Sequence, residues 1–181
     1  MKIKGGEKFE KAMRELAKKL DRPGTVKVGF LEGATYPDEN QTPVAMVAAI
    51  QNFGAPKVGI PPRPFFTNMV KDKSPTWPKV LGNTLKATGN DVPKTLGIMG
   101  QIVLGELQQA IIDTSDPPLS PVTIMLRGMR SNNPNLKVNR TTVEEARARV
   151  EGGKTNYGAS SKVFIDSGHM LKSADYEVNT K

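Results

Sequence analysis

Ala148 to Thr155 is the first of two segments that contain residue types with catalytic uses. It reads A-x-x-x-x-G-K-T, a loose form of the loop that binds nucleotide phosphates. Such a loop needs a strand before it and a helix after it, so that backbone N–H groups face the phosphates. Here a capped-helix pattern precedes the glycines and a polar stretch, 156–160, follows. We therefore interpret the segment as a glycine turn.

Asp166, Ser167 and His169 supply the three residue types of a hydrolase triad within four positions. Triad partners normally come from separate segments, with the base within hydrogen-bond reach of the nucleophile. Neighbours in one turn do not normally reach that geometry, and we expect instead that Asp166 or Ser167 caps a short helix. The chain has one histidine and no cysteine, so no thiolate or second imidazole supports a metal site. We expect no catalytic site, no metal ion and no cofactor.

The charge of the chain is strongly basic, with a formal net charge of +8 at pH 7. Such a surface commonly has a polyanionic neighbour, either nucleic acid or an acidic protein surface. Between Asp116 and Glu144 there is no acidic residue but there are four basic ones, which we predict to face a partner: Arg127, Arg130, Lys137 and Arg140. The alternative is an ordinary solvated surface, because spaced charges keep proteins soluble.

Periodic apolar residues predict a helix and two strands. Residues 9 to 20 have apolar side chains at helical spacing between charged ones, and this amphipathic pattern stops at 21–24. Apolar and polar residues alternate in 25–31 and again in 173–179, which predicts two half-buried strands. Because the backbone groups of each strand need a partner, we expect both strands in one antiparallel sheet.

Helices are predicted for most of the middle of the chain. Thr42-Pro43 is expected to start a helix over Val44 to Phe53, which is apolar nearly all round and therefore predicted to be buried on several sides. Further helices are expected near 65–70 and 75–86. Asp91 caps a long one that ends near Asp113 and contains three glycines, which indicate close packing of a neighbouring backbone, a bend or a weak helix.

The stretch from about 115 to 161 is predicted to be an extended or loop-rich excursion. It is rich in proline, asparagine and glycine, although short helices are expected at 120–130 and at 141–150, the second with a capping box. We interpret 131–161 as a polar arm-like insertion in a single domain over 1–181. Because it has little apolar area to bury, we expect it to be mobile in the free subunit and ordered in an assembly.

Ile60 to Phe66 contains a run of prolines that fixes an extended backbone. Prolines lower the entropy cost of ordering a segment, and the planar guanidinium of an arginine can bind a carboxylate or backbone carbonyls. We therefore predict a subunit interface made of Pro61, Pro62, Arg63, Pro64, Phe65 and Phe66. The alternative is that the two phenylalanines fill the core. An interface role predicts that Arg63→Ala leaves the monomer folded and impairs assembly.

Three segments in this order resemble the neck and tail-completion proteins of tailed bacteriophages, a family that includes tail terminators and head–tail joining proteins. They are Val26 to Phe30 followed by VAMVAAIQNFG at 44–54, IPPRPFF at 60–66, and FIDSGHMLKSADYEV at 164–178. The segment 118–124 is similar to another family segment. The polar stretch 131–161 is longer than the family's usual spacing.

The resemblance implies an α+β subunit, with a small antiparallel sheet packed with several helices, and no catalysis. It implies a structural virion protein that forms a homo-oligomeric ring, commonly six-fold, at the head–tail junction or the head-proximal end of the tail. Its partners would be other neck, connector and tail-tube proteins, and possibly DNA passing through the channel. We expect a soluble protein of the host cytoplasm during assembly and of the virion afterwards, with no membrane contact. The alternative is a basic nucleic-acid-binding or DNA-packaging accessory protein.

Overall fold

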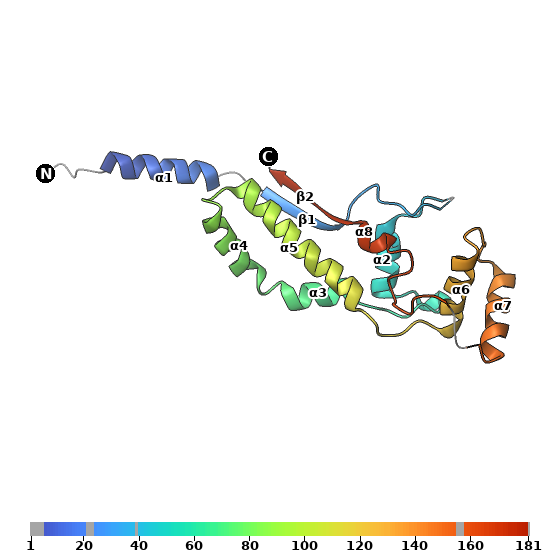
Figure 1. Ribbon diagram of the computed structural model, residues 1–181. Helices are drawn as coiled ribbons and strands as arrows, with labels where there is room; N and C mark the ends of the chain where they lie inside the picture. Colours follow the sequence, from blue (N-terminus) through green and yellow to red (C-terminus); the bar gives the residue numbers. More distant parts are fainter. Residues whose placement is uncertain (1–5, 21–23, 39, 155–157, 181) are drawn as a thin grey trace.

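The computed structural model describes residues 6–20, 24–38, 40–154 and 158–180. Within these ranges the fold is α+β, with eight α-helices, one short 3-10 helix and two strands (Figure 1). In chain order these are α1 (Gly6–Leu20), β1 (Gly24–Phe30), α2 (Val44–Phe53), η1 (Pro56–Val58), α3 (Phe65–Lys73), α4 (Trp77–Ala87), α5 (Val92–Asp113), α6 (Pro121–Asn132), α7 (Arg140–Glu151), α8 (His169–Lys172) and β2 (Ala174–Thr180).

The predicted sheet is confirmed: β1 and β2 pair antiparallel, with Val28 opposite Tyr176 and Phe30 opposite Ala174. In both strands the residues of one face are largely withdrawn from solvent, whereas Lys27 and Glu177 on the other face are exposed. The long helix α5 packs against both strands (Figure 1). The alternation seen in the sequence therefore has its expected cause, a sheet with one covered face.

Helix α5 begins as predicted, because the Asp91 side chain accepts a hydrogen bond from the Lys94 N–H at 3.0 Å. Of its three glycines, Gly100 is buried against β2. A Cβ atom at Gly100 would overlap the Tyr176 ring, whereas one at Gly97 or Gly105 would meet nothing within 4 Å. The close neighbour is therefore an aromatic side chain of the sheet and not a backbone.

The hydrophobic core lies where α2, α3 and α5 meet the C-terminal segment. Leu107 of α5 is fully buried at its centre, and the rings of Phe65 and Phe164 lie 4.9 Å apart. The buried residues of this core are Val44, Ala48, Phe65, Met69, Leu107, Ile111, Val163, Phe164, Met170 and Ala174. Segments from the first third and the last tenth of the chain thus share one core with α5.

Helix α2 differs from its prediction in two ways. The Thr42 hydroxyl does not cap it, because its backbone N–H and its hydroxyl both donate to the Asp38 carboxylate, at 2.8 and 2.6 Å, and Pro43 occupies the cap position. The helix is also not buried on all sides: Met46 is 49 % exposed and Phe53 73 % exposed. The single chain buries only one face of an almost wholly apolar helix.

The region predicted as an irregular excursion contains a helical hairpin. Helices α6 and α7 pack mainly against each other, at the end of the molecule opposite α1 (Figure 1). Ser120 caps α6 as predicted, but the cap of α7 is Asn139 and not a threonine. The short helices expected at 120–130 and 141–150 are confirmed, and Ala146 of α7 is fully buried and gives the hairpin a small core. The structure does not test the mobility predicted for 131–161, but the side-chain cap of α7 and the buried Ala146 lead us to expect an ordered α6–α7 hairpin in the free chain instead.

Helix α1 confirms the predicted N-terminal helix, although its predicted stop at 21–23 lies outside the described residues. It projects from the body of the subunit (Figure 1). Met13, on its apolar stripe, is 48 % exposed. Within the described ranges, no helix combines the length and hydropathy that crossing a membrane requires.

Replacing Gly100 by alanine tests the packing of the sheet on α5. The added methyl group must displace the Tyr176 ring, so we expect Gly100→Ala to lower the free energy of unfolding by about 1–3 kcal/mol. Gly105→Ala, in the same helix but with open space around the new Cβ, should raise it by roughly 0.5–1 kcal/mol. Urea unfolding followed by circular dichroism measures both, and equal effects of the two changes would contradict this packing.

Candidate functional site

The proline-rich turn folds back on the end of α2. Ala55 and Ile60 form a two-way bridge, in which each N–H donates to the other's carbonyl, at 2.8 and 3.1 Å. Gly54 has a φ of 76°, and a Cβ there would lie 2.7 Å from the Pro62 nitrogen. Glycine is therefore needed at this helix end both for its conformation and for the close approach of the turn.

A buried asparagine of α2 caps the next helix. The Asn52 side-chain oxygen accepts hydrogen bonds from the N–H groups of Phe66 and Thr67, at 3.1 and 3.2 Å, and its amide nitrogen donates to the Thr67 hydroxyl at 2.8 Å. These N–H groups belong to the first turn of α3, whose own cap residue, Pro64, has no side-chain donor or acceptor. The sequence analysis missed Asn52; the available signal was a polar residue within an apolar helix.

Arg63 binds carbonyl groups, as predicted for its guanidinium, but these belong to its own subunit. Its side chain is 5 % exposed, its Nε donates to the Pro117 carbonyl at 2.8 Å, and its Nη2 donates to the Pro118 carbonyl at 3.3 Å. Nη1 donates to the Gln51 side chain at 3.2 Å. Burial lowers the pKa of Arg63 from its ordinary value. Replacing Arg63 therefore removes hydrogen bonds within the folded chain.

The other residues of the turn divide between core and surface. Phe65 is in the core, so the alternative weighed for it is right, and Pro64 is half-buried. Pro61 and Pro62 are exposed, and Phe66 is 36 % exposed. The part of the turn that another protein can contact is thus Pro61, Pro62 and Phe66.

Arg127 of α6 holds the segment that leads into the core. Its Nη1 donates to the carbonyls of Ser160 and Lys162, at 3.2 and 2.6 Å, and its Nη2 donates to the Val163 carbonyl at 2.8 Å. Only 12 % of the side chain is exposed, and this burial lowers the pKa of Arg127, although the Asp166 carboxylate partly offsets the effect. Arg127 therefore binds backbone within the subunit.

Three of the four basic side chains predicted to face a partner have acceptors within the chain: Arg127, Arg130 and Arg140. Arg130 forms an ion pair and hydrogen bond with Asp166, whose other oxygen lies 3.8 Å from the Arg127 Nε. Arg140 pairs with Glu144, four residues further along α7, at 2.9 Å. The sequence did not reveal these ion pairs, because Asp166 is distant in the chain and Glu144 stands just at the edge of the acid-free interval; whether the four residues face a partner stays a prediction. Lys137 is exposed on the loop between the two helices.

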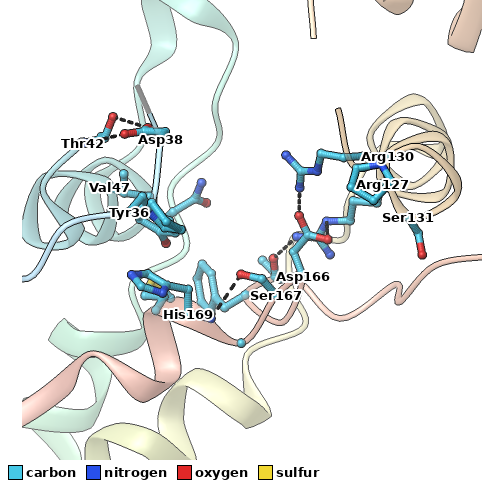
Figure 2. A pocket seen from close by; sticks show the side chains of 17 residues that line it. Tyr36, Asp38, Thr42, Val47, Arg127, Arg130, Ser131, Asp166, Ser167 and His169 are labelled. Atoms are coloured by element: carbon cyan, nitrogen blue, oxygen red, sulfur yellow. Dashed lines mark hydrogen bonds and ion pairs between the residues drawn. The ribbon is translucent and has the colours of Figure 1, made fainter. Parts of the chain in front are cut away.

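An open pocket of about 930 Å³ lies between α6, the loop before α2 and the turn before α8 (Figure 2). The His169 Nε2 lies 2.8 Å from the Thr35 carbonyl, which fixes it as the donor, and the imidazole is 4.8 Å from the Tyr36 ring. The Ser167 hydroxyl accepts from the His169 backbone N–H at 3.3 Å, but the cap position of α8 is Gly168 and has no side-chain cap, so the prediction that Asp166 or Ser167 caps this helix is wrong. Burial and the nearby Asp166 charge raise the pKa of Tyr36.

This arrangement does not assemble a nucleophile, a base and an orienting acid. Each of the three triad-type side chains has a different partner: Asp166 binds arginines (Figure 2), Ser167 binds backbone and His169 binds the Thr35 carbonyl. In the phosphate-loop pattern, Gly152 and Gly153 form the turn after α7 as predicted, and Thr155 lies outside the described residues. Among the described residues, no group of three His, Cys, Asp or Glu side chains is placed to hold a metal ion.

The surface around α2 contains a groove that the sequence did not predict. It has a volume of about 500 Å³ and lies between β1, α2 and the first turn of α3. Its lining is mainly apolar and includes Val28, Phe30, Ala49, Phe53 and Phe66.

In comparisons with known proteins, no family model, no curated protein and no solved structure matched the chain.

The hydrogen bonds of Arg63 can be tested by unfolding. Arg63→Ala leaves the two proline carbonyls without their donors, and hydrogen bonds to a charged group contribute about 1.5–3 kcal/mol each. We expect a loss of roughly 3 kcal/mol in the free energy of unfolding, with Trp77 fluorescence as the probe. Arg63→Lys should recover less than half of this loss, because an ammonium group lacks the planar fork. Stability close to that of the wild type in Arg63→Ala would contradict the role assigned to this side chain.

Proposed function

We propose that this chain is a structural virion protein of a tailed bacteriophage. It forms a homo-oligomeric ring at the head–tail junction or at the head-proximal end of the tail, completes the tail and joins it to the head. Its partners are copies of itself and other neck, connector and tail-tube proteins. The proposal rests on the resemblance of three segments to the neck and tail-completion family, and on the surface that those segments form.

The spatial arrangement of the family-like segments supports the proposal. Val44 and Ala48 from the first segment, Phe65 from the second and Phe164 from the third all contribute to one core. The turn of the second segment is hydrogen-bonded to the end of the first through Asn52. The residues that carry the resemblance thus form one packed unit.

The observation that carries the proposal is the apolar outer surface of this unit. Met46, Phe53 and Phe66 are exposed there, and Val58 of η1 is exposed nearby in the sequence. Exposing large apolar side chains to water is unfavourable, and clusters of them mark surfaces that bind other proteins. Self-association through this surface is what a ring subunit requires.

The alternative, a protein that binds nucleic acid through its basic surface, has less support from the side-chain contacts. Arg127, Arg130 and Arg140 all have partners within the subunit. Binding to phosphates would have to replace these contacts or use other cations. DNA in the channel of the ring remains compatible with the proposal as a weak, non-specific contact.

The oligomeric state of the purified protein tests the proposal. We expect native mass spectrometry and negative-stain microscopy to show closed rings, formed by the protein alone or after addition of tail tubes. Phe53→Glu should weaken this assembly about tenfold or more, because it places a charge on the apolar surface. Leu81→Glu, at an exposed site of α4, is the matched control and should assemble normally.

A protein that stays monomeric under both conditions would contradict the proposal. If that monomer also bound short duplex DNA with a steep dependence on salt concentration, the result would favour the nucleic-acid alternative.

A further inference from the structure

Helix α4 has an outer face whose only charged residues are basic. Lys79 and Lys86 are exposed and stand seven positions apart, so they lie on the same side of the helix, two turns from each other. Asn83 lies between them and is also exposed. From Lys73 to Asn90 the chain contains no acidic residue. Lys79, Asn83 and Lys86 together form the basic face of α4.

The opposite side of α4 is used by the subunit itself. Helix α4 packs mainly against α5 (Figure 1). The Trp77 indole donates to the Glu106 carboxylate at 2.8 Å, and the Thr88 hydroxyl lies 2.7 Å from the hydroxyl of Thr95 in α5. Helical spacing places Trp77 and Thr88 on the side of α4 opposite the two lysines. These contacts therefore fix the rotation of α4, with its basic face directed away from α5.

The lysines of the basic face lack the acidic partners that other helices of the chain provide. In α1 Glu10 pairs with Arg14, and in α7 Arg140 pairs with Glu144, in both cases four residues apart. Lys79 and Lys86 form no ion pair with any residue that the structure describes. Cations without local acids leave a positive potential at the surface, which a polyanion can neutralise.

Gly82 lies beside these lysines in the middle of α4. A Cβ atom there would meet nothing within 4 Å, so the packing of the subunit does not require a glycine at this position. Glycine destabilises an exposed helix relative to alanine, but it lets the backbone of a bound molecule approach closely. An open space thus adjoins the two lysines on the surface of α4.

We propose that the basic face of α4 binds the phosphate backbone of duplex DNA. Lysine and asparagine side chains are common donors to phosphate oxygens, in contacts that do not depend on base sequence. Protein interfaces, by contrast, are depleted in lysine and rely on aromatic or apolar anchors, and the basic face contains neither. A helix that binds a lipid surface inserts its apolar side, and that side of α4 already packs on α5.

This inference goes beyond the proposed function, because a face that binds phosphates does not require a ring. It also assigns DNA contact to residues other than those expected from the sequence. Arg127, Arg130 and Arg140 have acceptors within the chain, whereas the lysines of α4 are available. A contact made by so few cations is weak and sensitive to salt.

Fluorescence anisotropy with a short labelled duplex tests the inference. We expect Lys79→Gln/Lys86→Gln to bind the duplex about tenfold more weakly at low salt, and the slope of log K against log salt concentration to fall in magnitude by about two. Lys162→Gln/Lys172→Gln is the matched control, since it removes the same charge from exposed sites outside α4. It should lose less than about twofold in affinity, because long-range charge contributes less than direct phosphate contacts.

Three results would overturn the inference. They are equal losses in the two variants, no binding of the duplex by the wild-type protein at low salt, and tighter binding of poly-glutamate or phosphatidylserine vesicles than of DNA through the same two lysines. The wild-type protein and both variants should form the same assemblies. A wild-type protein that stays monomeric and still binds DNA through α4 would support this inference and contradict the proposed ring.

Discussion

Two buried guanidinium groups hold together the part of the subunit that lacks regular pairing. Arg63 binds the carbonyls of the segment between α5 and α6, and Arg127 binds three carbonyls of the segment that enters the core at Phe164. Carbonyls withdrawn from water need donors, and no backbone N–H of the described residues donates to these carbonyls outside regular helices and strands. An arginine has five N–H donors in one plane, so a single side chain can satisfy several carbonyls at once.

The position of the α6–α7 hairpin depends on these contacts. The hairpin packs mainly within itself, and Arg127 ties it to the segment that carries Val163 and Phe164 into the core. Asp166 follows two residues later and pairs with Arg130, so the same contacts also form the wall of the open pocket (Figure 2). The two arginines thereby supply hydrogen-bond donors to backbone carbonyls of the chain. The outer face of α2, the groove and Met13 of α1 nevertheless keep apolar surface exposed.

Local signals in the sequence predicted the helices and strands better than the contacts between them. Alternation predicted both strands, and Asp91 predicted the start of α5, because those signals act over a few residues. The two proline carbonyls that Arg63 binds are more than fifty residues away in the chain, and the acid that pairs with Arg130 is thirty-six residues away. Patterns over a few neighbouring residues therefore could not predict either contact. The burial of α2 was overestimated because an apolar helix does not reveal whether its own chain or another covers it.

Hydrogen exchange on the free subunit is the most direct test of the role of these arginines. We expect protected amides in α6 and α7 of the wild-type protein, and loss of that protection in Arg127→Leu while α5 and both strands keep theirs. Arg140→Leu, which removes an exposed pair within α7, should leave the pattern unchanged. The account is contradicted if α6 and α7 are unprotected in the free wild-type subunit, or if Arg127→Leu exchanges like the wild type.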